Sequence, residues 1–364
     1  MERRKFLRSA GLAGVLAGVL AGGSAPAIVH AQENIRWRLA SSFPKSLDTL
    51  IGAAETFAKN VAESTGGKFT VTVHAAGELV PAFGVVDALQ QGSIECANTA
   101  PYYFFGKDEA FAFDCAIPFG MNARQLTAWM YEGNGQKLLR EFYAPYNIVS
   151  LPMGNTGAQM GGWYRKEIKS VADFDGMKIR IGGFGGRVLA KLGVVSQNIP
   201  AGEIYSALEK GTIDATEFVG PHDDLKLGLH RVAPYYYYPA WWEGSAQTTL
   251  YINAKAFNGL SNEYKSIVRQ AASDSHVVTQ ARYDARNPAA LKQLIAEGAK
   301  LKRLPKDVMD AAFKASREVY AELNDKNPAW KKIYADYSRF MQAQYQWTPL
   351  AEGSYDQYMA AQKL

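Results

Sequence analysis

Two short stretches decide the fold: residues 88–95 read Ala-Leu-Gln-Gln-Gly-Ser-Ile-Glu, and residues 207–214 read Ala-Leu-Glu-Lys-Gly-Thr-Ile-Asp. Each reads as the end of a helix, a glycine suited to the position after a helix end, and the start of a short strand. Two copies of one helix-to-strand unit predict two similarly built lobes. The alternative is chance reuse of a common helix-ending pattern.

The strands of the two copies are expected to end near Asn98-Thr99 and near Glu217-Phe218. If the copies match, these strand ends occupy corresponding places in the two lobes. Ligands of open α/β sheets collect beyond the carboxyl ends of the strands. The pattern therefore predicts a binding cleft between the lobes.

Working outward, the first copy lies in an alternation of strands and helices. Apolar residues alternate from Ile35 to Leu39, which predicts a strand, and a helix with one apolar stripe is expected to open at Pro44. Gly66-Gly67 ends that helix, residues 69–73 form a second strand, and a short helix runs to Gly92. This order predicts an α/β fold with a largely parallel sheet.

The C-terminal third is predicted to be helical from about Asn262. Pro305 starts another helix, and Pro328 interrupts the chain before a last one. This third contains no catalytic or phosphate-binding motif. Packing, bridging of the lobes, or self-association into a homodimer are the roles we expect for it.

The first 31 residues have the parts of an export signal. Arg3-Arg4-Lys5-Phe6-Leu7-Arg8 precedes an apolar, Gly/Ala-rich run over residues 11–29, and Val29-His30-Ala31 fits a cleavage site. The paired arginines followed by Phe-Leu favour the twin-arginine route to the periplasm. An uncleaved membrane anchor is the alternative, but glycines break the run, and no later stretch has the roughly 20 apolar residues needed to span a bilayer.

Charge and size exclude some classes of protein. The formal net charge is +5, and subtracting the +3 of residues 1–31 leaves +2, too little to favour nucleic acid or an anionic membrane as a partner. The chain that remains exceeds one usual core and predicts two domains or lobes. Cys96 and Cys115 could pair in an oxidising compartment or remain separate buried thiols.

Motifs for nucleophilic or metal-dependent catalysis are missing from the sequence. There is no HExxH, no Cys/His cluster and no G-x-S-x-G elbow. The run Gly182-Gly183-Phe184-Gly185-Gly186 follows an apparent strand, but a dinucleotide loop would need glycine at Val188. It predicts a tight strand-to-helix turn whose N–H groups face an anion or a cleft.

Two charged residues stand at predicted strand ends. Arg180 ends the strand before the glycine turn, where a guanidinium can grip a carboxylate with two hydrogen bonds. Glu217 ends the strand of the second copy, where a carboxylate suits an anion site only if a cation lies between them. The alternatives are a surface salt bridge for Arg180 and a capping or surface acid for Glu217. Aromatic runs at 102–105 and 235–242 fit either a ligand pocket or a core.

Several motifs together resemble the solute-binding subunits of TRAP (tripartite ATP-independent periplasmic) transporters, the DctP-like family. They are the twin-arginine signal, Leu39-Ala40-Ser41-Ser42-Phe43-Pro44, Ala76-Gly77-Glu78-Leu79-Val80-Pro81, Met177-Lys178-Ile179-Arg180 and residues 210–217. Residues 154–163 and 235–243 are similar to the branch that binds 2-oxo and 2-hydroxy monocarboxylates such as pyruvate or lactate. The resemblance implies a two-lobed periplasmic binding fold with extra C-terminal helices.

The resemblance also implies roles for individual residues. Arg180 would grip the ligand carboxylate, Gln159 would reach ligand and cation, and Tyr102 or Tyr103 would touch the ligand's other end. The substrate-binding residues implied are Arg180, Gln159, Tyr102, Tyr103, Asn155, Phe218 and Glu243.

A bound cation, Na⁺ or Ca²⁺, is implied as a bridge between ligand and protein, with Gln159, Glu217, Phe218 and Glu243 as its ligands. Phe218 would offer its carbonyl oxygen; the branch often has tryptophan there, and phenylalanine changes the pocket wall. Two acids and a ligand carboxylate are balanced better by Arg180 with Ca²⁺ than with Na⁺. No catalytic cofactor is expected.

The expected organisation is a signal at 1–31, lobe I at 32–157, lobe II at 158–246, a return to lobe I with a long helix at 247–305, and C-terminal helices at 306–364. The partners implied are the small and large membrane subunits of the transporter. An enzyme acting on the same acids, or a sensory receptor, are the alternatives. An enzyme would need a general acid or base beside the reacting carbon, and the sequence indicates no histidine or lysine at that place.

Overall fold

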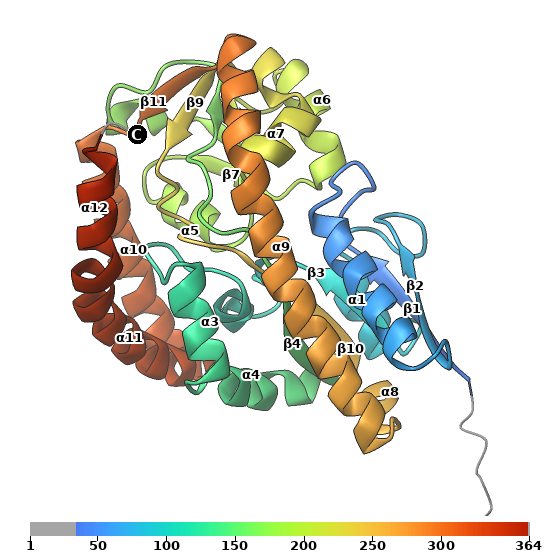
Figure 1. Cartoon of the computed structure of the whole chain (residues 1–364). Helices are drawn as coiled ribbons and strands as arrows, with labels where there is room; N and C mark the ends of the chain where they lie inside the picture. The colour runs from blue at the N-terminus through green and yellow to red at the C-terminus, as the bar shows by residue number, and fades with distance from the viewer. Residues whose placement is uncertain (1–33, 363–364) are drawn as a thin grey trace, which may run out of the picture. The chain divides into compact units, whose positions relative to one another are not determined.

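The computed structural model describes residues 34–362, so the predicted export signal at 1–31 lies outside the described residues. Residues 34–362 form one compact unit around two β-sheets (Figure 1). Within them no helix has both the length and the apolar character that a bilayer span requires.

The first sheet has five strands in the order β2-β1-β3-β10-β4. β1 pairs in parallel with β2 and β3, while β10 is antiparallel to β3 and β4. The strands are β1 (Ile35–Ser41), β2 (Phe69–His74), β3 (Cys96–Thr99), β4 (Ile148–Asn155) and β10 (Gln247–Asn253).

The second sheet has six strands in the order β11-β9-β5-β8-β6-β7. β6 pairs in parallel with β7 and β8, and β5 is antiparallel to β8 and β9. The strands are β5 (Trp163–Tyr164), β6 (Lys178–Arg180), β7 (Val195–Gln197), β8 (Ala215–Thr216), β9 (Tyr235–Tyr238) and β11 (Lys300–Arg303).

The two sheets have the same topology, which confirms the prediction of two similarly built lobes. Read from one edge, β2-β1-β3-β10-β4 corresponds to β7-β6-β8-β5-β9 with the same parallel and antiparallel pairs, and β11 is the addition. The repeated sequence units behave alike: the helices before β3 and β8 are each followed by a glycine, Gly92 or Gly211, with φ of +71°. The prediction of a largely parallel sheet is confirmed, because the described strands of each sheet run in one direction except for a single antiparallel strand, β10 in the first sheet and β5 in the second.

Helices cover both sheets and connect them. The helices are α1 (Leu50–Ser64), α2 (Val85–Gln90), α3 (Ala123–Tyr131), α4 (Gly135–Tyr143), α5 (Phe184–Ala190), α6 (Ile204–Glu209), α7 (Pro221–Leu227), α8 (Ala254–Asn258), α9 (Asn262–Ala296), α10 (Lys306–Lys326), α11 (Pro328–Thr348) and α12 (Ser354–Ala360). Two short 3-10 helices, η1 (Pro101–Phe104) and η2 (Glu109–Asp114), follow β3.

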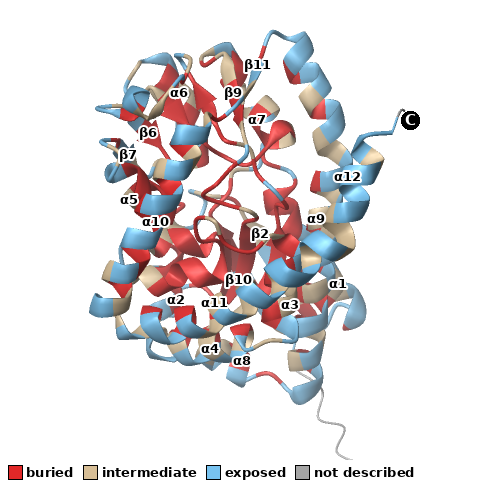
Figure 2. Ribbon diagram, turned by 90° about the vertical axis from the view of Figure 1, so that its left-hand side faces the viewer, coloured by how far each residue is buried: buried red, intermediate tan, exposed pale blue. Residues whose placement is uncertain are grey.

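The 35-residue helix α9 belongs to both lobes. It packs against α1 and β4 of lobe I and against α7 of lobe II (Figure 1). The C-terminal helices connect the lobes a second time, since α10 packs on α5 and α11 on α3, α4 and η2. Figure 2 shows the buried residues gathered around the sheets, with exposed residues on the outer faces of the helices.

Some local expectations differ from the structure. The helix expected at Pro44 begins at Leu50, because Pro44 starts a turn closed by the Leu47 N–H on its carbonyl. The last helix is not single: α11 is followed by a π-helical turn over 349–353 and by α12. Cys96 and Cys115 are separate, buried free thiols.

The domain boundaries stay a prediction. The chain crosses between the sheets in three segments: 156–162 and 239–246, which contain the expected boundaries at 157/158 and 246/247, and 254–299, which includes α9. Within the segment expected to return to lobe I, β10 joins the first sheet, whereas β11 joins the second.

Candidate functional site

Most of the predicted site residues come together where the lobes meet. Lobe II contributes Arg180 at the end of β6 and Glu217 and Phe218 just after β8; the crossing segment 239–246 contributes Glu243, and η1 of lobe I contributes Tyr102. Except for Tyr103, which is partly exposed, every predicted site residue is buried. A cluster of charge this deeply buried requires partners for its polar atoms.

Arg180 is held in one orientation by its own lobe. Its Nε donates to the carbonyl of Ile199 at 3.1 Å, and its Nη1 donates to the carbonyl and to Oε1 of Glu217, at 2.7 and 2.6 Å. The ring of Phe218 lies 5.3 Å from Cζ. Nη2 makes no hydrogen bond with the residues that the structure describes. The guanidinium therefore keeps its outer donors for a further acceptor.

Burial raises the pKa of the two acids beside Arg180. For Glu217, desolvation outweighs the Arg180 charge and the Gly182 N–H, which donates to Oε1 at 2.7 Å, and brings the pKa to about 7. Desolvation and the charge of Glu217 raise the pKa of Glu243 well above its ordinary value, against Arg180 and the Tyr102 hydroxyl. Two carboxyl groups in this position favour a cation, which would lower both pKa values.

Three buried oxygen atoms lack partners near this point, and they belong to the predicted cation ligands. They are Glu217 Oε2, Glu243 Oε2 and Gln159 Oε1, none of which has a hydrogen-bond partner among the described residues. An unsatisfied buried polar atom is unfavourable by about 1–3 kcal/mol, so three of them in a native fold call for an explanation. Oxygen ligands are what Na⁺ and Ca²⁺ prefer. The residues thus fit a hard cation.

Gln159 and Asn155 stand on the first crossing. Gln159 Nε2 donates to Thr156 Oγ1 at 3.2 Å, and the next residue, Met160, donates its N–H to the carbonyl of Val219 on the Glu217 loop. Asn155 Oδ1 accepts the N–H of Gly157, and its buried Nδ2 finds no partner in residues 34–362. No hydrogen bond of the described residues joins Asn155 to Arg180 or to the acids.

Tyr102 covers the site from lobe I by packing on the glycine turn. A Cβ at Gly182 would come within 2.6 Å of its ring, and one at Gly183, where φ is +56°, within 2.5 Å of its side chain. The ring of Tyr103 packs edge-on against Tyr102, with centroids 5.1 Å apart. The glycine turn predicted from the sequence thus donates an N–H, that of Gly182, to the Glu217 carboxylate. Because its first two residues have no side chains, Tyr102 of lobe I can pack directly on it.

Asp224 is a supporting residue that sequence reasoning missed. Buried on α7, it accepts Trp163 Nε1 at 2.9 Å and the Tyr236 hydroxyl at 2.7 Å, and its other oxygen lies 3.4 Å from the N–H of Val219. It thereby fixes the loop that carries Glu217. An acid in the first turn of a helix usually faces water, so nothing in the sequence indicated its burial.

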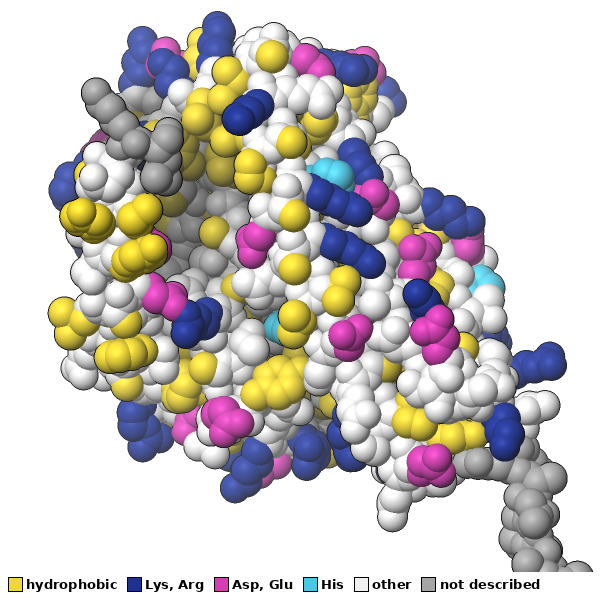
Figure 3. Space-filling model, in the orientation of Figure 1, with side chains coloured by type: hydrophobic (Ala, Val, Ile, Leu, Met, Phe, Trp, Pro, Cys, Tyr) yellow, Lys and Arg dark blue, Asp and Glu magenta, His cyan; other side chains and the backbone are white. Residues whose placement is uncertain are grey.

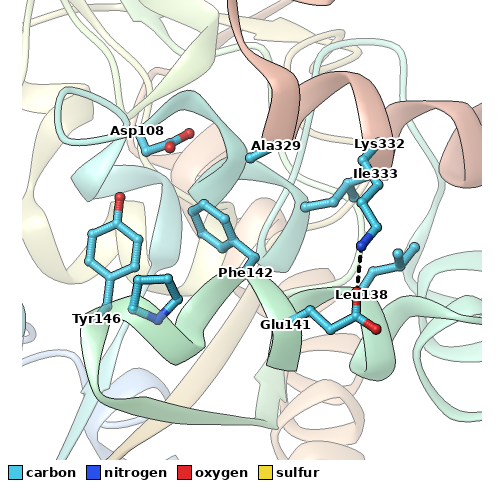
Figure 4. A pocket seen from close by; sticks show the side chains of 9 residues that line it. Asp108, Leu138, Glu141, Phe142, Tyr146, Ala329, Lys332 and Ile333 are labelled. Atoms are coloured by element: carbon cyan, nitrogen blue, oxygen red, sulfur yellow. Dashed lines mark hydrogen bonds and ion pairs between the residues drawn. The ribbon is translucent and has the colours of Figure 1, made fainter.

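A separate cavity of about 370 Å³ lies between α4 and α11 (Figure 4). Its lining includes Leu138, Phe142 and Ile333, with the ion pair of Lys332 and Glu141 at 2.5 Å beside them. None of the predicted site residues lines it.

The fold and this site define a two-lobed receptor that encloses a small ligand between its lobes. The match to a family model agrees: residues 40–327 match the bacterial extracellular solute-binding proteins of family 7, DctP. The chain belongs to this family, which confirms the resemblance drawn from its motifs.

Several relatives cover almost the whole chain. A monocarboxylate 2-oxoacid-binding periplasmic protein of Nostoc is 44% identical and covers 99% of this chain and 100% of its own length. A TRAP solute-binding protein of Bordetella bronchiseptica is 50% identical, with a TM-score of 0.89 over 90% of this chain and 98% of that one. Its structure is a dimer of mixed occupancy, with copurified calcium and picolinate in the active site.

A further structure, from Pseudoalteromonas atlantica, holds sodium and pyruvate. It is 37% identical, with a TM-score of 0.87, and the match covers 91% of this chain and 100% of that one. A protein of Colwellia psychrerythraea, 36% identical with a TM-score of 0.87 over 90% of this chain and all of that one, holds calcium and pyruvate. Small carboxylates with Na⁺ or Ca²⁺ thus recur among the relatives.

Proposed function

We propose that this protein is the periplasmic receptor of a TRAP transporter and captures a small 2-oxo or 2-hydroxy monocarboxylate of the pyruvate or lactate class together with a cation. The observation that carries the proposal is the buried cluster of Arg180, Glu217 and Glu243. Among the described residues, Nη2 of Arg180 donates no hydrogen bond and one carboxylate oxygen of each acid has no partner. A carboxylate for the guanidinium and a cation for the acids would satisfy all three. The ligands of the related structures support this chemistry.

In this proposal Arg180 binds the ligand carboxylate, and Gln159, Glu217, Glu243 and the carbonyl of Phe218 hold Na⁺ or Ca²⁺. Tyr102, Tyr103 and Asn155 complete the ligand pocket. A cation held by these residues would supply positive charge beside the bound acid. No bond of the ligand changes: the receptor delivers it to the membrane subunits of the transporter, after export by the twin-arginine route.

The test is a calorimetric and thermal-shift screen of the purified chain with pyruvate, lactate, longer 2-oxo acids and dicarboxylates, each with Ca²⁺, Na⁺ or a chelator. Binding raises the melting temperature by mass action. We expect a cation-dependent response to 2-oxo or 2-hydroxy monocarboxylates. A response to dicarboxylates alone, or turnover of the bound acid, would contradict the proposal.

We also propose a homodimer formed through the C-terminal helices. Large apolar side chains are exposed at the end of α11, in the π-helical turn over 349–353 and on α12, where Figure 3 shows hydrophobic side chains on the left-hand side of the molecule. They are Tyr345, Trp347, Leu350, Tyr355 and Tyr358. Several large apolar side chains exposed in one region are what an interface with another protein would bury. Light scattering of the unaltered chain and of Leu350→Glu should give a dimer and a monomer, respectively; two equal masses would contradict this surface.

A further inference from the structure

A second group of charges joins the lobes outside the ligand site. Asp48 lies in the turn between β1 and α1 of lobe I, and its Oδ1 accepts from Lys226 Nζ at 2.5 Å and from His222 Nε2 at 3.1 Å. Both partners stand on α7 of lobe II. Asp48 is therefore a single anion of one lobe held by two side chains of the other.

Helix α9 adds a third partner from its C-terminal half. Arg286 Nη1 lies 3.4 Å from Asp48 Oδ2 and 3.1 Å from Thr49 Oγ1. The next residue, Asn287, accepts the backbone N–H of His222. Burial alone would raise the pKa of Asp48, but the hydrogen bonds from Lys226 and His222 bring it to about 2. Asp48 is thus held as an anion where lobe I, lobe II and the helix common to both meet.

Asp48, His222 and Asp223 also come close enough for a metal ion, with their ligand atoms within 4.8 Å of one another. The positive charge that a metal would bring is already supplied, however, because Lys226 lies against Asp48 and Arg286 stands beside it. Asp223 in turn accepts the Tyr283 hydroxyl at 2.5 Å. The arrangement is that of an ion-pair clamp.

We propose that Asp48 is a positioning residue that sets ligand affinity without touching the ligand, by clamping lobe I to α7 in the closed arrangement. The inference rests on the proposed function, since it takes the closed form as the one that retains the carboxylate. A contact made only in the binding-competent state raises affinity by the factor by which it shifts the open–closed equilibrium.

The expected size of the effect is modest. The Asp48 side chain is about half exposed (49%), and exposed ion pairs are weak and screened by salt. With three partners, Asp48→Asn should weaken pyruvate or lactate binding three- to tenfold, mainly through faster release. The loss should shrink at high ionic strength, because salt already weakens the clamp in the unaltered chain.

Asp87 offers a matched control. It is equally exposed (51%) and pairs with Lys107 at 2.6 Å, but both residues belong to lobe I. Asp87→Asn should leave the affinity unchanged. Lys226→Met, which breaks the clamp from lobe II, should reproduce the effect of Asp48→Asn, and the two changes together should weaken binding little more than either one alone.

The experiment measures Kd and release rate for each variant at low and high salt, with small-angle scattering of the ligand-free proteins. We expect a larger open fraction for Asp48→Asn and Lys226→Met only. Kd and scattering unchanged by Asp48→Asn, or an equal loss of affinity in Asp87→Asn, would overturn the clamp. If the unaltered chain bound no small carboxylate, the proposed function would fail, while the scattering comparison would still decide whether the clamp exists.

Discussion

The ends of the matching strands carry neutral side chains in lobe I and charged ones in lobe II. In lobe I, Ser42 follows β1 and Thr99 ends β3, and their hydroxyl oxygens lie 2.7 Å apart. At the ends of the corresponding strands of lobe II, Arg180 ends β6 and Glu217 follows β8, with a contact of 2.6 Å; by strand register they match Ala40 and Asn98 of lobe I, which are neutral as well. Two lobes with the same topology therefore carry chemically different side chains at their strand ends.

The two lobes also differ in whether the polar atoms at these strand ends have hydrogen-bond partners. Ser42 gives its only hydroxyl hydrogen to the carbonyl of Ala82, so Thr99 donates to Ser42 and the pair is complete within lobe I. In the pair of Arg180 and Glu217, an outer guanidinium nitrogen and one carboxylate oxygen make no hydrogen bond with any residue that the structure describes. Lobe II therefore supplies the charge for binding, and lobe I supplies the cover with Tyr102.

The largest expected effect comes from removing the charge of lobe II. Arg180→Met should weaken binding of small carboxylates more than 100-fold, because binding then buries the ligand carboxylate without its charged partner, a loss of about 3–5 kcal/mol. Calorimetry with pyruvate and lactate measures it, with circular dichroism to show that the chain still folds. Micromolar binding by the folded variant would remove Arg180 from the site.

Next in size is the effect of one acid. Glu243→Gln keeps an oxygen but loses a charge, and a charged contact of this kind is worth about 1.5–3 kcal/mol, or about ten- to 150-fold. We expect Ca²⁺ to be needed at correspondingly higher concentration for ligand binding, measured by titrating CaCl2 into chelator-treated protein. Glu141→Gln, on the surface, is the control. Equal calcium dependence in both variants would show that Glu243 is not a cation ligand.

Part of the fold and part of the candidate site could be predicted from the sequence. The repeated units at 88–95 and 207–214 predicted the paired lobes, because helix ends and their glycines are local features. Arg180 and Glu217 were predicted at strand ends for the same reason. The short strands Trp163–Tyr164 and Ala215–Thr216 could not be predicted, since two residues have no periodicity and their partners lie far away in the chain.

Other features depend on tertiary contacts alone. Asp48 and Asp224 look alike in sequence as acids at helix starts, yet one is half exposed in a clamp and the other is buried behind the Glu217 loop. The pairing of Tyr102 with Gly182 joins residues from different lobes, so only the closed structure shows why the turn lacks side chains.

That pairing is tested by a smaller change. Gly182→Ala adds a methyl group that meets the Tyr102 ring at 2.6 Å, so closure must displace the ring, at about 1 kcal/mol or about fivefold in affinity. Gly202→Ala, whose new methyl group meets nothing within 4 Å, should bind normally. Calorimetry of both variants decides; equal affinities would show that Tyr102 does not close on the turn when ligand binds.

The smallest effect is expected in lobe I. Ser42→Ala breaks the hydrogen bond to Ala82 and leaves Thr99 to find another acceptor, which should lower the free energy of unfolding by about 1 kcal/mol. Affinity for the ligand should change less than twofold, because the hydroxyl hydrogens of Ser42 and Thr99 are both used within lobe I. Urea unfolding and calorimetry on one preparation separate the two quantities. A tenfold loss of affinity at unchanged stability would place the neutral strand ends in the ligand site, and the division of charge and cover between the lobes would no longer hold.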